Sequence, residues 1–186
     1  MNYEFNSDWV TSHEQDWREI FSEFVGRPHL RFLEIGSYEG RSTVWWLDNV
    51  LTDPASKITC VDPWAWGVDK ELRFDRNIVA TGRSNQVRKI KSESARALPR
   101  LGENSFDAAY IDGSHEAADA LLDGLLIMRL LKVGGIMVFD DYGWAGCEDS
   151  NRHHLPGLGI DAFLQLRDYE IEVIHKRYQV AVKKLR

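Results

Sequence analysis

Four residues in the second half of the sequence could carry acid and base chemistry. Asp112 follows the apolar run FDAAYI, and the pair Asp140 and Asp141 ends the apolar run IMVF. His115 lies three residues after Asp112. Carboxylates bind hard divalent cations, and an imidazole can act as a general base. Whether these groups can work together depends on the elements that position them.

Apolar runs of strand length alternate with helical patterns, an order typical of a parallel sheet built from βαβ units. Strands are expected at 31–35, 57–62, 87–91, 106–112 and 136–140, and an antiparallel hairpin at 169–175 and 178–185. Helices are expected at 12–24, 44–51, 69–81, 116–131 and 161–168, with a loop at 143–158. Ligands of open parallel sheets bind at the carboxyl ends of the strands, so the acids should lie close together there.

Three like charges in one cleft would raise each other's pKa, whereas a divalent cation would neutralise them. We therefore predict a metal site formed by Asp112, Asp140 and Asp141. The alternative is that Asp112 and Asp141 are turn or cap residues that face solvent. At the start of the expected helix, the dipole disfavours the imidazolium form of His115 while the carboxylates favour it, which suits a general base. His153 and His154 are secondary candidates for contact with substrate or metal.

A glycine-bearing turn follows the first expected strand, in RFLEIGSYEGRST. Its spacing is G-x-x-x-G, unlike the G-x-G-x-x-G of dinucleotide-binding folds, which favours a ligand without a phosphate chain. Asp62 ends the second strand, where a carboxylate could accept hydrogen bonds from ribose hydroxyls. Glu93 and Ser94 follow the third strand, where a base edge could be recognised. The alternatives are a plain tight turn at Gly36 and a simple turn role for Asp62.

Composition narrows the class of protein. The chain has 186 residues, with 23 Lys and Arg against 29 Asp and Glu, a net charge of −6. Because its basic residues are scattered, we expect no nucleic-acid partner. The sequence starts without a signal-like segment and has no run of membrane-spanning length, so a cytoplasmic location is expected. We expect one domain over 1–186, with an N-terminal helical segment at 1–30 and a core at 31–186.

The motifs LEIGSYEGRST, CVDPW, FDAAYIDGSH and LKVGGIMVFDDY occur in this order and are followed by the hairpin. Over most of its length the chain resembles the class I S-adenosylmethionine-dependent methyltransferases. The class implies a Rossmann-like, doubly wound, seven-stranded and mostly parallel sheet with an antiparallel C-terminal hairpin and helices on both faces. It implies cofactor contacts by Glu34, Gly36, Ser37, Tyr38, Gly40, Ser42, Asp62, Glu93, Ser94 and Asp112.

Within this class, YIDGSHE and FDDYG resemble the macrocin and mycinamicin type of sugar O-methyltransferase and the cephalosporin-hydroxylase-like group. In these relatives an acid after the fourth strand and an acidic pair after the fifth hold Mg²⁺, and a histidine is the base. The matching residues here are Asp112, Asp140, Asp141 and His115. The resemblance implies O-methylation of a hydroxyl on a small-molecule acceptor. Those enzymes are longer than this chain, so the resemblance does not extend to the acceptor itself.

Three other functions stay open. The first is a metal-independent methyltransferase acting on a small molecule or a protein side chain. The second is a nicotinamide-dependent oxidoreductase, which the glycine spacing and the terminal hairpin disfavour. The third is a non-catalytic S-adenosylmethionine-binding module. The sequence also leaves the oligomeric state open, including a homo-oligomer.

Overall fold

The computed structural model describes residues 3–146, 151 and 154–186. The chain forms two compact units, residues 1–93 and 94–186, and each is described by itself. The strands are β1 (Arg31–Ile35), β2 (Lys57–Asp62), β3 (Val87–Lys91), β4 (Phe106–Ile111), β5 (Leu131–Phe139), β6 (Ile171–Lys176) and β7 (Val180–Lys184). Their order is β3-β2-β1-β4-β5-β7-β6, with the last two strands forming an antiparallel hairpin. This order confirms the predicted Rossmann-like α/β fold, whereas the single domain stays a prediction.

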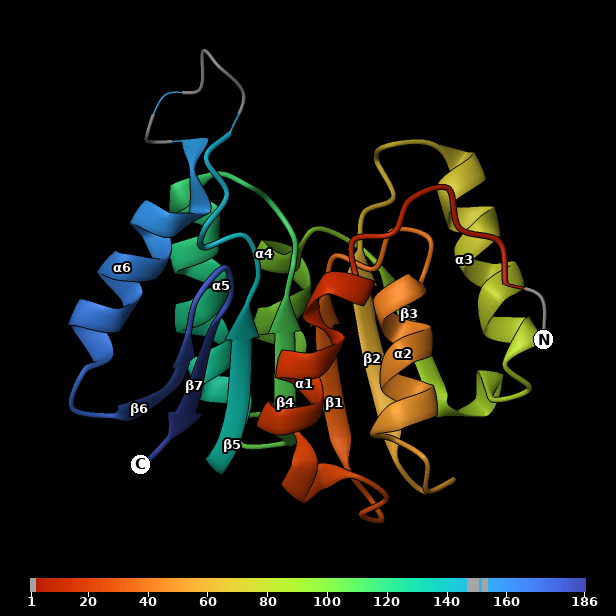
Figure 1. Ribbon diagram of the computed structural model, residues 1–186, viewed down its shortest axis with the longest axis horizontal. Coiled ribbons are helices and arrows are strands. Elements are labelled where there is room, and N and C mark those ends of the chain that lie inside the picture. The colour runs from red at the N-terminus through yellow and green to blue at the C-terminus, as the bar shows by residue number, and fades with distance from the viewer. Residues whose placement is uncertain (1–2, 147–150, 152–153) are drawn as a thin grey trace. The chain divides into compact units, whose positions relative to one another are not determined.

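In the first unit, β1, β2 and β3 pair in parallel, with Glu34 opposite Cys60 and Asp62 opposite Lys91. The helices are α1 (Glu14–Ile20), α2 (Arg41–Asn49) and α3 (Val68–Ala80). Figure 1 shows α1 and α2 on the face of β1 and β2 that is turned to the viewer. Between them, the Trp46 ring stacks on Trp17 at 4.3 Å and on Phe32 at 4.9 Å between ring centroids. This buried aromatic cluster joins both helices to β1.

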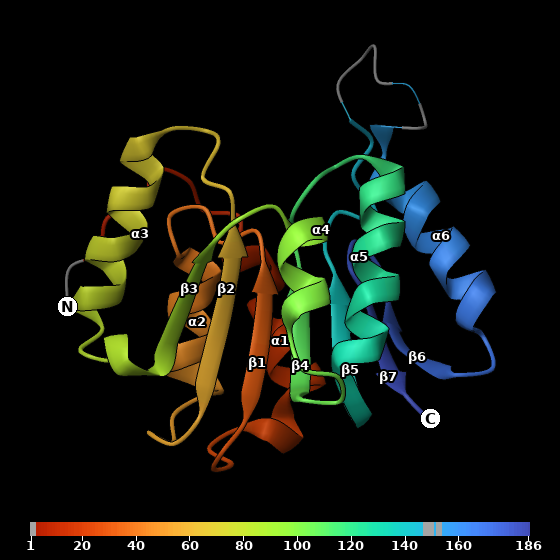
Figure 2. The ribbon, with the colours of Figure 1, turned by 180° about the vertical axis from the view of Figure 1, so that it is seen from behind.

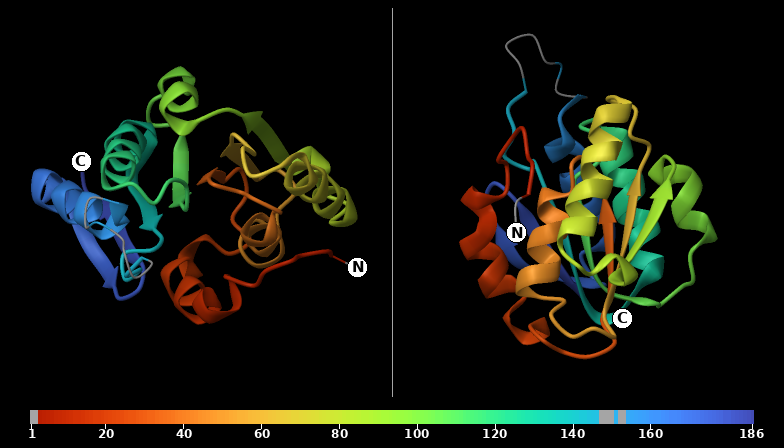
Figure 3. Two further views of the ribbon diagram at one scale, coloured as in Figure 1. Left: turned by 90° about the horizontal axis from the view of Figure 1, so that it is seen from above. Right: turned by 90° about the vertical axis from the view of Figure 1, so that its right-hand side faces the viewer.

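In the second unit, β4 pairs in parallel with β5, and β7 pairs antiparallel with both β5 and β6. The helices are α4 (Ser94–Ala97), α5 (Ala117–Leu130) and α6 (Pro156–Arg167). Figure 2 shows α4 and α5 in front of β4 and β5, and Figure 3 shows α6 beside α5. A Cβ on Gly159 would lie 1.9 Å from the carbonyl oxygen of Ala117, so α6 packs directly on the first turn of α5. This packing fixes the start of α5, just after His115.

Buried Lys184 ties the last strand of the second unit to α5. Its Nζ donates to the carbonyl oxygens of Met128 at 2.8 Å and Leu131 at 2.7 Å, and to Asn104 Oδ1 at 3.2 Å. The last carbonyls of a helix have no hydrogen-bond partner within the helix, and the helix dipole is negative at this end. A lysine here therefore donates hydrogen bonds to these carbonyls and also interacts favourably with the dipole. Burial lowers the pKa of Lys184.

Two predicted boundaries in the second unit were wrong. β5 begins at Leu131 instead of residue 136, because a register shift lets Leu131 pair with Phe106 before Ile136 pairs with Ala108. α6 begins at Pro156 instead of residue 161, since proline is well suited to the first turn of a helix. The predicted loop therefore stops before Pro156, and its residues 147–150, 152 and 153 lie outside the described residues, as does the candidate His153.

The N-terminal helical segment is shorter and less regular than predicted. A 3₁₀ turn (Thr11–His13) leads into α1, and a second one (Ser22–Phe24) follows it. In the part of the chain that the structure describes, no helix has both the length and the apolar character needed to cross a membrane.

Candidate functional site

Asp62 organises the glycine-bearing turn of the first unit. Its Oδ2 accepts hydrogen bonds from the backbone N–H groups of Ser37 at 2.8 Å and Tyr38 at 2.9 Å. Its Oδ1 accepts one from Trp64 N–H at 2.5 Å. A carboxylate has about four acceptor positions, so these bonds leave room for about one further donor. From the end of β2, Asp62 thus holds the turn that follows β1. The sequence had left open a turn role for Asp62, but it did not indicate these contacts with the glycine-bearing turn.

The turn itself contains backbone conformations that L residues rarely adopt. The φ angles are +79° at Gly36, +45° at Tyr38 and +83° at Gly40. A Cβ on Gly40 would also lie 3.0 Å from the ring of Phe74, so a side chain there would meet α3. Gly40 is the N-cap of α2 and offers no side-chain hydrogen bond to its first N–H groups. Such groups suit an anionic ligand such as a carboxylate.

Glu34 is completely buried at the end of β1, beneath this turn. Its Oε2 accepts hydrogen bonds from the Ser37 hydroxyl at 2.6 Å and from the Thr43 hydroxyl. Among the described residues, its Oε1 has no hydrogen-bond partner. Burial raises the pKa of Glu34, and the two hydroxyls oppose the rise. A buried acceptor without a donor is uncommon in folded proteins and is a feature that a bound ligand can satisfy.

The remaining predicted cofactor residues lie in both units. Ser42 is the second residue of α2 and is buried. Glu93 is exposed and follows Ser92, whose N–H donates to the Asp62 carbonyl at 3.1 Å. Ser94 begins α4 in the second unit. Burial raises the pKa of Asp123 to about 6.

The second unit brings Asp112, His115 and Asp141 together. One ligand atom from each residue lies within 4.8 Å of the others. His115 Nε2 is 2.9 Å from Asp141 Oδ2, and this hydrogen bond raises the pKa of His115 above 6.5, against the opposing effect of burial. These residues line a small pocket together with Ser114, Pro156 and Ile160. The predicted proximity of acid and base within this unit is thus present.

Asp140 has a different environment from its neighbour Asp141. It is buried, and its Oδ1 accepts hydrogen bonds from Gln179 Nε2 at 2.9 Å and from the Asp141 N–H at 2.8 Å. Its Oδ2 accepts one from the Tyr110 hydroxyl, which lies 3.5 Å from Asp112 Oδ2. Burial raises the pKa of Asp140, and the charge of Asp141 adds to the rise. The compact cluster therefore consists of Asp112, His115 and Asp141, whereas the predicted metal site consists of Asp112, Asp140 and Asp141.

The tip of the β6–β7 hairpin holds the segment after β5. The Tyr178 hydroxyl donates to Asp141 Oδ1 at 2.8 Å, and the Tyr178 carbonyl accepts from Gly143 N–H at 2.9 Å. Asp141 has a φ of +56°, a conformation that such contacts must maintain. Trp144 lies beside His115, with ring centroids 4.5 Å apart.

Sequence reasoning missed these surrounding residues. Tyr110 could have been found, because residues two apart on a strand point to the same face and Tyr110 is two positions before Asp112. No sequence signal connects Tyr178, Gln179 or Trp144 to the acids, since their contacts depend on how the hairpin folds back.

The fold and the turn define an α/β protein of the Rossmann-like class. Residues 33–142 match the family described as a methyltransferase domain, and the chain belongs to this family, which confirms the class suggested by the motifs. An O-methyltransferase of Aspergillus hancockii, hkm8, is 28% identical over 125 residues, 67% of this chain and 47% of the relative. Tapetum-specific methyltransferase 1 of Arabidopsis thaliana is 30% identical over 128 residues, 67% and 52% of the two chains. The chain thus spans about half the length of these curated relatives.

Solved structures share the fold over nearly the whole chain. A putative O-methyltransferase from Klebsiella pneumoniae has a TM-score of 0.75 at 14% identity, covering 98% of this chain and 84% of its own. An O-methyltransferase from Bacillus cereus in complex with SAH has a TM-score of 0.71 at 15% identity, covering 97% and 84%. At this level of identity the likeness establishes the fold alone.

Proposed function

We propose that this chain transfers a methyl group from S-adenosylmethionine to a hydroxyl of a small-molecule acceptor. Membership of the methyltransferase domain family and the O-methyltransferase relatives support the reaction class. The observation that carries the proposal is the turn from Gly36 to Gly40, whose backbone is fixed by Asp62 above the unpartnered Glu34 oxygen.

The residues of the turn fit the amino-acid and ribose parts of this cofactor. Glu34 Oε1 is an acceptor for an ammonium group or for a water bound to it, and the first N–H groups of α2 suit a carboxylate. Asp62 retains about one acceptor position for a ribose hydroxyl. Glu93 and Ser94 would contact the adenine. When bound, S-adenosylmethionine supplies an electrophilic methyl group on a sulfonium centre.

His115 is the proposed general base. Its imidazole would accept the proton of the acceptor hydroxyl, and Asp141 would orient the ring through the 2.9 Å contact with Nε2. Asp141 would also stabilise the imidazolium that results. Most of the acceleration would come from holding the hydroxyl in line with the methyl group.

A divalent cation, with Mg²⁺ favoured, belongs to this proposal at Asp112, Asp140 and Asp141. The carboxylates of Asp112 and Asp141 fit a hard cation, because their oxygens already lie in one cluster with His115. To bind the same cation, Asp140 would have to give up hydrogen bonds that it now accepts from Tyr110 and Gln179. The cation would lower the pKa of the acceptor hydroxyl.

A metal-independent methyltransferase is the second candidate, and one observation favours it. The pair of His115 and Asp141 is already a base with its orienting acid, so proton removal does not require an ion. The cytoplasmic location, the small-molecule acceptor and the absence of a nucleic-acid partner stay predictions.

Calorimetric titration with S-adenosylhomocysteine, with NAD as the comparison ligand, tests the cofactor class. We expect micromolar binding of the first, about −8 kcal/mol, and no binding of NAD. Binding of neither ligand would contradict the proposal, and binding of NAD alone would support the oxidoreductase alternative. Methyl transfer to a panel of hydroxylated acceptors then separates an enzyme from a non-catalytic binding module.

A further inference from the structure

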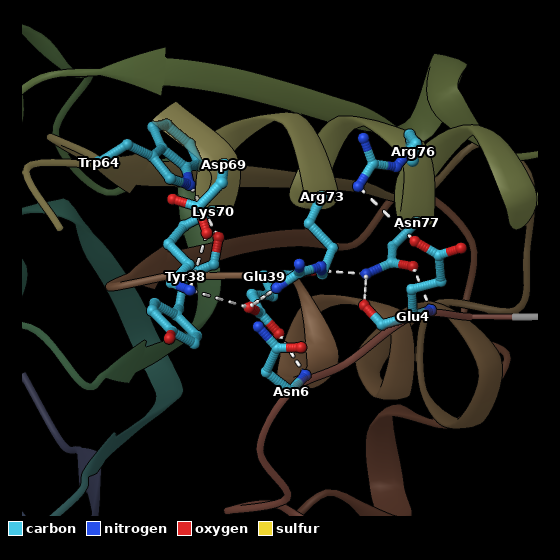
Figure 4. A network of polar contacts seen from close by, with 10 residues as sticks. All are labelled: Glu4, Asn6, Tyr38, Glu39, Trp64, Asp69, Lys70, Arg73, Arg76 and Asn77. Carbon is cyan, nitrogen blue, oxygen red and sulfur yellow. Dashed lines mark hydrogen bonds and ion pairs between the residues drawn. The ribbon is translucent and has the colours of Figure 1, made fainter. Parts of the chain in front are cut away.

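Residues 3–9, called here the N-terminal segment, pack against α3 within the first unit. Asn77 of α3 pairs with Glu4 in both directions: its Oδ1 accepts from Glu4 N–H and its Nδ2 donates to the Glu4 carbonyl, each at 2.9 Å (Figure 4). Asn77 is only 2% exposed. The buried Asn77 amide thus pairs with both backbone polar groups of Glu4, as the backbone of a neighbouring strand would.

The same asparagine holds the cofactor turn. Asn77 Nδ2 also donates to the carbonyl of Glu39, which lies between Tyr38 and Gly40, at 2.9 Å. One amide group therefore contacts the N-terminal segment and the turn at once (Figure 4).

Glu39 makes the second connection between the turn and the segment. Its carboxylate is only 2% exposed, and Oε2 accepts the Asn6 N–H at 2.7 Å. Oε1 pairs with Arg73 of α3 and lies 3.8 Å from Lys70 Nζ (Figure 4). Burying a carboxylate is costly unless charges and donors compensate, and here an N–H of the N-terminal segment is one of the compensating groups.

Tyr38 and Arg41, which lie close to Glu39 in the chain, contact the segment as well. Arg41, the first residue of α2, makes two 2.8 Å hydrogen bonds to the Asp8 carboxylate. The ring of Tyr38 lies 5.5 Å from that of Trp9 between centroids. Three of the four residues from 38 to 41 thus have partners in the segment, on a turn whose left-handed φ angles its surroundings must maintain.

We propose that Glu39 and Asn77 are positioning residues that couple docking of the N-terminal segment to cofactor binding. The inference rests on the proposed function, because it takes this turn as the cofactor site. Asp62 fixes the turn from the sheet side, and the docked segment fixes it from the α3 side. Coupling of this kind is reciprocal, so the cofactor favours the docked segment at equilibrium by the same factor with which the docked segment tightens cofactor binding.

The test compares three variants with the wild-type protein. Asn77→Ala removes the shared amide, and Asn6→Pro removes the N–H donor to Glu39 at an exposed position without altering α3. Arg76→Ala is the matched control, because Arg76 neighbours Asn77 and reaches Glu4 only through an exposed ion pair of 3.6 Å, which contributes little. For each protein we would measure calorimetric affinity for S-adenosylhomocysteine, the thermal midpoint, and hydrogen exchange of amides 4–9 with and without ligand.

We expect S-adenosylhomocysteine to slow exchange of amides 4–9 in the wild-type protein. Asn77→Ala and Asn6→Pro should weaken its binding about tenfold, a typical coupling, while Arg76→Ala leaves it unchanged. Asn6→Pro keeps the test decisive if Asn77→Ala fails to fold. Normal affinity for S-adenosylhomocysteine in a folded variant whose segment exchanges freely would overturn this inference and leave the proposed function standing. No binding by the wild-type protein would overturn the proposed function and this inference with it.

Discussion

The hydroxyl of Tyr178 donates a 2.8 Å hydrogen bond to Oδ1 of Asp141, while Oδ2 of the same carboxylate lies 2.9 Å from Nε2 of His115. Asp141 therefore connects the tip of the C-terminal hairpin to the proposed base. Burial and this hydrogen bond both raise the pKa of Tyr178, so the phenol stays protonated and remains a donor. The next residue, Gln179, donates to Asp140 in the same way.

Tyr178→Phe should slow methyl transfer about tenfold with unchanged S-adenosylhomocysteine affinity. The variant removes a hydrogen bond to a charged group, worth about 1.5–3 kcal/mol, at a position 41% exposed. Steady-state rates and calorimetry together check this result, with Tyr169→Phe as a control at another exposed tyrosine. Wild-type turnover in Tyr178→Phe would mean that Asp141 keeps its position without the hairpin.

His115→Ala should reduce methyl transfer by about two to four orders of magnitude, the usual contribution of a general base, while cofactor affinity stays intact. His154→Ala is the comparison, because His154 pairs with exposed Glu116 instead of with the acids after β5. If His115→Ala turned over normally, the base would have to be another group.

The rate should rise with pH through a midpoint above 6.5. The base must be neutral, and the hydrogen bond with Asp141 raises the pKa of His115, so deprotonation occurs at higher pH than for a free imidazole. Asp141→Asn should move the midpoint back toward 6.5.

The stability of the fold should change in the opposite direction. The ion pair of His115 with Asp141 stabilises the fold below the pKa of His115 in the unfolded chain, and this contribution is lost as pH rises through the higher pKa of His115 in the folded protein. The pH profile of the rate gives the midpoint, and NMR titration gives the pKa of His115. An unshifted midpoint in Asp141→Asn would contradict the assignment of His115 as the base.

Exhaustive chelation with EDTA should abolish methyl transfer, and added Mg²⁺ should restore it. Burial raises the pKa of Asp140 and the charge of Asp141 adds to the rise, and a cation at Asp112, Asp140 and Asp141 would offset that repulsion. Mn²⁺ binding followed by electron paramagnetic resonance gives a readout independent of activity, and Asp112→Asn should weaken it. Full activity after chelation would favour the metal-independent alternative.

Lys184→Met should lower the free energy of unfolding by about 2 kcal/mol, because buried carbonyls at the end of α5 would lose their donor. Urea unfolding measures this change, and Lys183→Met, at the more exposed neighbouring position, should have a much smaller effect. Equal effects of the two substitutions would show that the contacts of Lys184 are not what stabilises the fold.

The sequence predicted those parts of the fold that depend on local patterns. The limits of β1, β2 and β3 agree with the prediction. β1 and β2 are largely apolar runs followed by turn residues, whereas β3 has only the weaker signal of Val87 and Ile90. The starts of β5 and α6 were wrong, since a register shift and a helix-initiating proline do not change hydrophobic periodicity.

The candidate sites were predictable only in their residue types. The motifs selected Asp62, His115 and the acids, but they did not indicate that Asp62 would bond chiefly to backbone N–H groups. Contacts such as that of Tyr178 with Asp141, 37 positions away, or of Asn6 with Glu39 depend on chain reversal and leave no periodic signal.

The position of Lys184 in the sequence bears on how the chain folds during synthesis. The lysine caps α5 from 56 positions beyond Met128, so the last turn of that helix remains uncapped while the ribosome makes everything between them. Contacts of such long range form late, and chains generally fold from the amino-terminal side as they emerge. The second unit should therefore gain protease resistance only when β7 has left the ribosome.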